Sequence, residues 1–118
     1  MNDNKGEILI PIARASIADA LGRPLKADES AIWLQDEAAS FVTLTQNAQL
    51  RGCIGTLEAH RSLLEDVKHN ARAAAFQDPR FTPLTSEELD IAEVEVSLLS
   101  AMQAMSFSRE QDALAQLR

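Results

Sequence analysis

The sequence contains a single cysteine, Cys53, and no tyrosine. One cysteine excludes an intramolecular disulfide, so nothing in the chain calls for an oxidising compartment, and we expect a cytoplasmic protein. The only histidines, His60 and His69, lack the spacing of metal ligands relative to this cysteine, so the sequence predicts no metal site. Both histidines are expected to be solvated surface residues. The sequence does not identify a cofactor, which stays unknown at this point.

Positive charge and long apolar runs are also scarce. The chain has 11 lysines and arginines against 18 acidic residues, which gives a formal net charge of −7. Binding to nucleic acid is driven mainly by cationic side chains that release counterions, so a nucleic-acid partner is not expected. The apolar run over 8–12 contains Pro11 and is too short for a signal peptide or a membrane span, so we expect no membrane association.

The remaining composition is that of an ordinary globular protein. Hydrophobic residues make up 46% of the chain and charged residues 25%, far from the signature of disorder. A chain of 118 residues can build one hydrophobic core but not two, and no repeat, low-complexity tract or linker divides it. We therefore expect residues 1–118 to form a single domain.

Helical spacing of apolar residues predicts a first helix over 8–21, with Gly22 as its C-terminal cap. Pro11 requires this helix to begin close to Ile8, because only first-turn amides have no partner to lose. The residues expected on its buried face are Ile10, Ala13, Ile17, Ala20 and Leu21.

Two capping boxes predict further helices. Ser62 and Glu65 form the first box, and Pro79 ends the helix that follows it. Its apolar stripe is expected to contain Leu64, Val67, Ala71, Ala74 and Ala75, and its outward face Glu65, Asp66, Lys68, His69 and Arg72. Thr85 and Glu88 form the second box, which predicts a short helix. A last helix is expected from Ser108, carrying Ala113, Leu114 and Leu117.

Three segments have the pattern of strands. The residues over 41–45 and 50–57 are rich in β-formers and predict a hairpin with a turn at 46–49. Its register stays open, because Asn47 is followed by Ala48 and not by the glycine that a tight primed turn prefers. Strict alternation over 91–99 predicts a strand with one solvated face. The fold class is therefore α+β, an antiparallel sheet with helices packed on it.

The segment from Arg51 to Thr56 is the first candidate for a functional site. Alternation along a strand places Arg51 and Cys53 on one face, and a neighbouring cation favours the nucleophilic thiolate. Glycines such as Gly52 and Gly55 are costly in a strand and often mark a bulge or a close approach by another group. The alternative is inert packing, because a free cysteine is among the most buried residue types.

Three polar residues farther along have both a structural and a functional interpretation. Asn70 lies at the edge of an apolar stripe and needs hydrogen-bond partners, either in a neighbouring loop or strand or in a ligand. Asp78 and Arg80 flank Pro79 in a rigid turn, in which Asp78 binds the backbone. In the functional alternative, Arg80 binds an anion.

These motifs are similar to the signature of the AMMECR family. The matching residues are Leu50-Arg51-Gly52-Cys53-Ile54-Gly55-Thr56, then the segment 70–81, Pro83-Leu84 and Glu88-Leu89, in order and spacing. The resemblance covers essentially the whole chain and implies an α+β fold without an agreed activity. It also implies a pathway shared with Memo-like and radical-SAM proteins as partners. Family domains continue past the position of Arg118, so the resemblance implies a domain shortened at its C-terminus.

The resulting hypothesis is an AMMECR-type domain whose cleft takes a small polar or anionic ligand, with Cys53 as nucleophile or acid. The residues expected to bind the ligand are Arg51, Gly52, Gly55, Thr56, Asn70, Asp78 and Arg80. The rival hypothesis is a non-catalytic interaction module or scaffold, so whether the chain is an enzyme stays open. In either case we predict a homo-oligomer, because apolar residues of the strand over 91–99 and of the last helix need covering.

Overall fold

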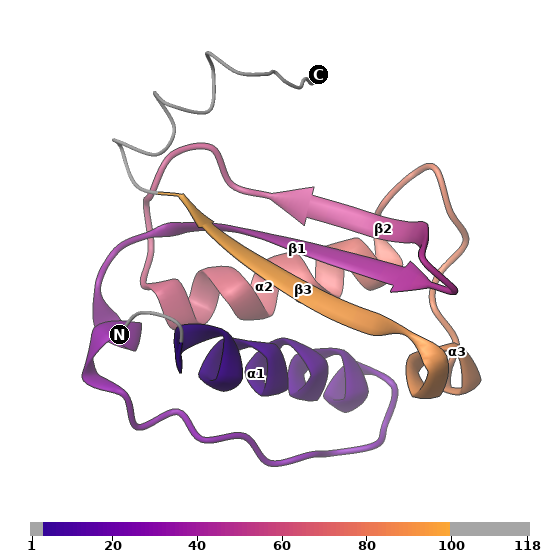
Figure 1. The fold of residues 1–118 in the computed structure, drawn as a ribbon, viewed down its shortest axis with the longest axis horizontal. Coiled ribbons are helices and arrows are strands. Elements are labelled where there is room, and N and C mark those ends of the chain that lie inside the picture. Colours follow the sequence, from indigo (N-terminus) through magenta and orange to yellow (C-terminus); the bar gives the residue numbers. More distant parts are fainter. Residues whose placement is uncertain (1–3, 100–118) are drawn as a thin grey trace.

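The computed structural model of the protein describes residues 4–99, and Figure 1 shows how its elements are arranged. In chain order they are α1 (Asn4–Ala20), the 3-10 helix η1 (Ile32–Gln35), β1 (Ala39–Gln46), β2 (Gln49–Gly55), α2 (Leu63–Phe76), α3 (Ser86–Ile91) and β3 (Glu93–Leu99). The helix predicted from Ser108 lies outside the described residues. The predicted α+β class is confirmed, because the helices pack on an antiparallel sheet of three strands.

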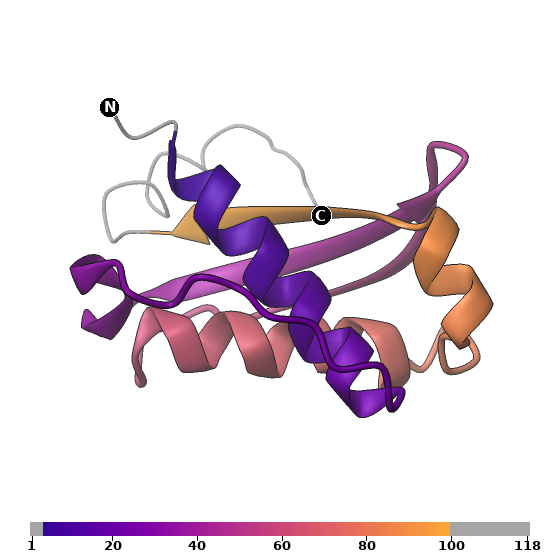
Figure 2. The same ribbon diagram turned by 90° about the horizontal axis from the view of Figure 1, so that it is seen from below.

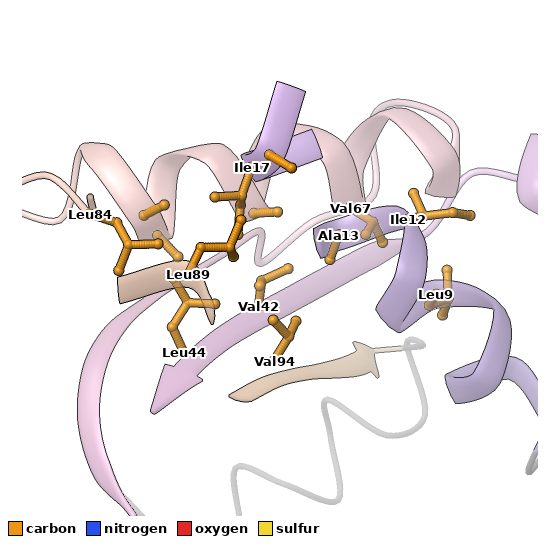
Figure 3. Packing of buried hydrophobic residues seen from close by; sticks show 14 of the residues in the cluster. Leu9, Ile12, Ala13, Ile17, Val42, Leu44, Val67, Leu84, Leu89 and Val94 are labelled. Atoms are coloured by element: carbon orange, nitrogen blue, oxygen red, sulfur yellow. The ribbon is translucent and has the colours of Figure 1, made fainter. Parts of the chain in front are cut away.

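The sheet has the order β2-β1-β3, so β1 is central and pairs antiparallel with both neighbours. Residues opposite one another in such pairs lie on the same face of the sheet. One row, Val42 with Ile54 and Val96, faces the helices, and α2 runs beneath the sheet while α1 lies against α2 and β3 (Figure 2). The core fills the space between these layers (Figure 3).

The predicted start of the first helix is wrong. The helix α1 already includes Asn4 and carries Pro11 in its interior. Pro11 has no amide to donate, so the carbonyl of Glu7, one turn earlier, loses its partner. Both residues are exposed, and water can therefore satisfy that carbonyl, which is why the helix continues through the proline.

The predicted buried face of α1 is also partly wrong. Ala13 and Ile17 are fully buried, but Ile10 is 36% exposed. Leu9 and Ile12, at 1% exposure each, lie in the core instead (Figure 3). The spacing of Leu9, Ile12, Ala13 and Ile17 is as regular a helical stripe as the predicted one. Packing against α2 and β3 decides between them.

The helix α2 begins after Ser62 as predicted, and the Ser62 hydroxyl accepts a hydrogen bond of 3.2 Å from the Glu65 amide. The reciprocal bond from the Ser62 amide to the Glu65 carboxylate, which the predicted capping box requires, is not found among the described residues. Val67, Ala71 and Ala74 lie in the core. Asp66, expected on the outward face, is instead fully buried. Its neighbours supply enough hydrogen-bond donors to hold a carboxylate without water, as described below, so the helix turns this residue inward.

The predicted hairpin is confirmed, and its turn is tighter than the sequence indicated. Asn47 and Ala48 form a two-residue loop with φ angles of 52° and 64°. Two positive φ angles are typical of the primed turn that matches the twist of paired strands. The pairing shifts between Leu44, opposite Gly52, and Thr45, opposite Leu50, which leaves Arg51 as an extra residue in a bulge.

The predicted strand over 91–99 is confirmed as β3, and α3 begins with the complete capping box of Thr85 and Glu88. The Arg14 guanidinium on α1 donates hydrogen bonds to the carbonyls of Leu89 (2.9 Å) and Ala92 (2.6 Å), which ties α1 to the segment that leads into β3. Among residues 4–99, no helix has the length and apolarity needed to cross a membrane.

Candidate functional site

Both glycines of the candidate motif lie on β2 where another group comes close to the backbone. A side chain at Gly52 would collide with the carbonyl oxygen of Ala74 on α2. A side chain at Gly55 would collide with the ring of Phe41, which lies opposite it on β1. An aromatic ring packed over a cross-strand glycine is a known way to compensate for the missing side chain. Packing within the chain therefore accounts for both glycines.

Arg51 is held in a fixed position by the segment that follows α2. Its guanidinium donates to both carboxylate oxygens of Glu88, from Nε at 3.1 Å and from Nη2 at 2.9 Å. Nη2 also donates to the Thr82 carbonyl at 2.9 Å, and the Phe81 ring centroid lies 5.7 Å from the guanidinium carbon. The hydrogen bonds from Arg51 and from the Thr85 backbone lower the pKa of Glu88 to about 2. Arg51 Nη1 is buried without a partner among the described residues.

Cys53 is half-buried on the sheet face opposite the helices. Its Sγ lies 3.2 Å from the Thr43 hydroxyl, and its backbone amide donates to the Asp78 carboxylate at 3.1 Å. In the described part of the chain, no histidine or acidic side chain makes a hydrogen bond with the thiol. Strand β2 is an edge strand, and Asp78 satisfies an amide that would otherwise point away from the sheet unpaired.

Asp78 and Arg80 form the turn that the sequence predicts. Arg80 donates to Asp78 from Nε (3.0 Å), from Nη2 (2.7 Å) and from its backbone amide (3.1 Å). The hydrogen bond from the Arg80 side chain, which outweighs the effect of burial, holds the pKa of the Asp78 carboxyl far below its usual range. The Arg80 side chain is 57% exposed, and its guanidinium carbon lies 5.4 Å from the Phe81 ring centroid. Phe81 therefore lies close to both arginines.

Thr56 and Asn70 belong to a separate buried network centred on Asp66. The Asp66 carboxylate accepts hydrogen bonds from Thr56 Oγ1 (2.8 Å), Arg61 Nε (2.8 Å), Ser40 Oγ (2.7 Å), the Ser40 amide (2.8 Å) and Asn70 Nδ2 (3.1 Å). Burial by itself raises the pKa of Asp66, but the bonds from Ser40, Arg61 and Thr56 together lower it below the usual value. The network joins β1, the end of β2 and α2.

The structure thus divides the predicted site residues between two places. Arg51, Cys53, Asp78 and Arg80 surround the outer edge of β2, whereas Thr56 and Asn70 lie in the Asp66 network. The prediction that Asn70 is buried and bonds outside its own helix is confirmed, because it is 2% exposed and donates to the Ser40 carbonyl at 2.9 Å. The prediction that Arg51 and Cys53 lie on one face of the strand assumed regular alternation, and the bulge at Arg51 interrupts that alternation. Their side chains have separate partners.

Sequence reasoning missed Glu88, Phe81 and Asp66 as members of these clusters. The capping box had already assigned Glu88 to the helix start, and the carboxylate serves both Thr85 and Arg51. Asp66 and Asn70 are four residues apart, which places them on one face of a helix. That spacing was the available signal. His60 and His69 are exposed, as predicted.

The described residues contain no group of three or more His, Cys, Asp or Glu side chains that could hold a metal ion. A hollow of about 470 Å³ lies away from the motif, between the start of α1, η1 and the end of β3. Its walls include Leu9, Trp33 and Leu98. This hollow therefore does not coincide with the cleft that was predicted around the motif.

Comparisons with known proteins identify a family and several similar proteins. The AMMECR1 family model matches residues 10–117. A protein of Aeropyrum pernix is 38% identical over 110 residues, which cover 89% of this chain and 48% of the relative. A protein of Sulfurisphaera tokodaii is 42% identical over 113 residues, covering 87% of this chain and 49% of the relative. The chain spans about half the length of the curated relatives it matches.

A solved structure is similar in both fold and sequence. The crystal structure of an uncharacterized protein from Pyrococcus horikoshii matches with a TM-score of 0.73 and 35% identity. The match covers 80% of this chain and 51% of that one. The three-stranded sheet and its helices are therefore an arrangement shared with a longer protein.

Proposed function

Because the chain belongs to the AMMECR1 family, we propose that it is a non-catalytic binding module that holds a polypeptide partner on the sheet face opposite the helices. One observation carries the proposal. The guanidiniums of Arg51 and Arg80 are each paired with a carboxylate of the same chain, at 2.9 Å and 2.7 Å. Two arginines that the sequence analysis assigned to ligand binding thus make ion pairs that support the fold beside this sheet face.

This pairing disfavours an anionic ligand at the motif. An incoming anion would have to displace Glu88 or Asp78, or be held beside them at a cost in like-charge repulsion. The thiol has the Thr43 hydroxyl as its neighbour and no base among the described residues, so an activated nucleophile lacks its proton acceptor. A module that binds through surface shape and charge needs neither feature.

The proposed binding face combines a small apolar and hydroxylic centre with acidic side chains. Its central row is Cys53, Thr43 and Glu95, and Glu93 lies farther along β3. Both glutamates are exposed, and the whole chain carries a charge of −7. The complementary partner is a polypeptide with lysines or arginines around an apolar contact, since complementary charge steers association and selects partners. Memo-like and radical-SAM proteins, which the family resemblance implies, are the first candidates.

The lone cysteine makes a direct test possible. Cys53 would be coupled to a photo-reactive maleimide and irradiated with a purified Memo-like protein, and separately with a purified radical-SAM protein. The control carries the same probe on α2, through Cys53→Ser combined with Arg72→Cys, because Arg72 is exposed on the helix layer. We expect crosslinks from the sheet face and none from the control position.

A charge reversal measures the same contact without a probe. Glu95→Lys is expected to raise the Kd for the partner about tenfold. Glu65→Lys, an equal charge change on the exposed side of α2, is expected to leave the Kd within about twofold of the parent value. Calorimetric titration gives both values. Equal crosslinking from the two probe positions, together with an unchanged Kd for Glu95→Lys, would show that this face is not the binding surface.

A second candidate function rests on Arg51 Nη1, which is buried without a partner among residues 4–99. A buried donor without an acceptor is costly, and a small polar ligand that supplied an acceptor would remove that cost. In this version Cys53 provides the chemistry. Native mass spectrometry of the purified protein tests it, because a copurifying small molecule that is lost in Cys53→Ser would favour the ligand site over the module.

A further inference from the structure

The hollow at the end of the molecule opposite the hairpin turn is lined mainly by apolar side chains. The N-terminal turns of α1 contribute Gly6 and Leu9, and the end of β3 contributes Leu98 and Leu99. Trp33 of η1 forms another part of the wall, and Lys5 Nζ lies 5.0 Å from the centroid of its ring. Asp36 and Glu37 supply carboxylates to the lining. A hollow of about 470 Å³ with such walls exposes apolar surface that is stabilised by being covered.

We propose that residues 101–107 of the same chain cover this hollow, with Met102, Met105 and Phe107 against its apolar walls. Leu99, the last described residue, is itself part of the lining, so the segment starts at the hollow. The sequence over 101–107 contains no charged residue, and the first charge after it is Arg109. An uncharged apolar segment can enter without leaving a buried charge unpaired.

The composition of the segment also fits an irregular space. Two of the three methionines of the chain lie in it. Methionine is unbranched and flexible, so it fills gaps that stiffer side chains leave open. Covalent connection through Leu99 gives the segment a high effective concentration at the hollow, which favours it over a segment of another molecule.

Trp33 is the only tryptophan of the protein and gives the test its reporter. The full chain would carry Cys53→Ser and Phe107→Cys, with a nitroxide on the new thiol. The Trp33 indole N–H, a single peak in a ¹⁵N correlation spectrum, is expected to lose its intensity while the label is oxidised and to regain it on reduction. The control places the label at Ile91→Cys, a residue that is 62% exposed at the end of α3, beside the end of β3 that lies away from the hollow, and is expected to leave the peak intact.

Mixing separates the segment of the same chain from that of a second copy. A ¹⁵N-labelled chain without nitroxide is combined with an unlabelled chain that carries it. The proposal requires an unchanged Trp33 peak in this mixture. Loss of intensity there would assign the hollow to a second copy and overturn the proposal, as would a peak that keeps its full intensity in the singly labelled chain.

A second measurement uses no label. Replacing Met102, Met105 and Phe107 together by serine is expected to shift Trp33 emission to longer wavelength and to increase its quenching by acrylamide. The matched control replaces Leu25, Leu57 and Ile91 by serine, which are 51%, 79% and 62% exposed. Equal emission from both variants and the parent protein, with cooperative melts retained, would overturn the proposal.

Discussion

Gly52 lies where β2 and α2 approach most closely. Adding a methyl group there would drive it into the Ala74 carbonyl, and neither backbone can yield without disturbing the core. We predict that Gly52→Ala lowers the free energy of unfolding by about 2 to 4 kcal/mol. Gly6→Ala is the matched control, because nothing lies within 4 Å of the added atom and α1 gains helix propensity. It is expected to be neutral or stabilising by up to about 1 kcal/mol in urea unfolding.

A result in which the two alanine variants unfold at the same urea concentration would contradict this explanation of Gly52. The glycine would then need a reason outside the packing of β2 on α2. The same comparison bears on the interpretation of the motif, because a structural requirement for Gly52 means that the motif is not evidence for a ligand by itself.

Asp66 is the residue whose charge matters most to the core. Asp66→Asn keeps the shape of the side chain but turns one acceptor oxygen into a donor that faces other donors. It also leaves the Arg61 guanidinium, 2.8 Å away, without its carboxylate. We expect a loss of about 2 to 4 kcal/mol in the free energy of unfolding, as for other broken buried pairs.

Glu65→Gln serves as the neighbouring control for Asp66→Asn. Glu65 is exposed, and the bond that caps α2 uses its backbone amide, which the substitution keeps. Its stability is expected to change by less than about 0.5 kcal/mol. Similar losses in both variants would mean that the helix start, and not the Asp66 network, is the sensitive feature.

At the scale of elements, the turn of the β1–β2 hairpin contains backbone strain that one substitution is expected to relieve. Ala48 has a φ of 64°, a region in which an L-residue other than glycine is strained. Ala48→Gly is therefore predicted to raise the free energy of unfolding by about 1 kcal/mol. Ala59→Gly, at an exposed position outside the positive-φ region, should give no gain, because glycine there only adds freedom to the unfolded chain. Thermal unfolding of the three proteins decides whether the turn is strained.

At the scale of the whole molecule, acid is expected to loosen the contact between β2 and α3. The pKa of Glu88 falls from 4.5 to about 2 in the folded chain, so the folded state favours the ionised carboxylate. The stability this gives is fully present above pH 4.5 and is lost as the pH falls towards 2. Glu88→Gln should flatten the decline in this window, whereas the exposed control Glu87→Gln should follow the parent protein. Parallel pH profiles for all three proteins would contradict the role of the Arg51–Glu88 pair.

Self-association is a prediction that belongs to the same scale. Within one chain Val94 is only 9% exposed, and Val96 and Leu98 pack against the core. On the sheet, Leu50 is 43% exposed and offers apolar surface to a second copy. Light scattering at micromolar concentrations is expected to give a mass above that of one chain. A monodisperse monomer whose melt does not depend on concentration would contradict this prediction.

Most of the elements could be predicted from the sequence, because their signals are local. Capping boxes at Ser62 and Thr85, the proline after α2 and the alternation along β3 each act within a few residues. The order of the hairpin strands follows from a short connection between two β-rich runs. The family could be predicted as well, since the motif and its spacing to the segment 70–81 are properties of the chain alone.

The face that each helix buries and the use of each polar residue could not be predicted in this way. Whether α1 buries Ile10 or Leu9 depends on α2 and β3, which are distant in sequence. Asp66 could be placed inward only once Ser40, Thr56 and Arg61 had been brought around it by the sheet. A charge is stable in the core only when distant parts of the chain supply its partners, and those partners exist only in the folded molecule.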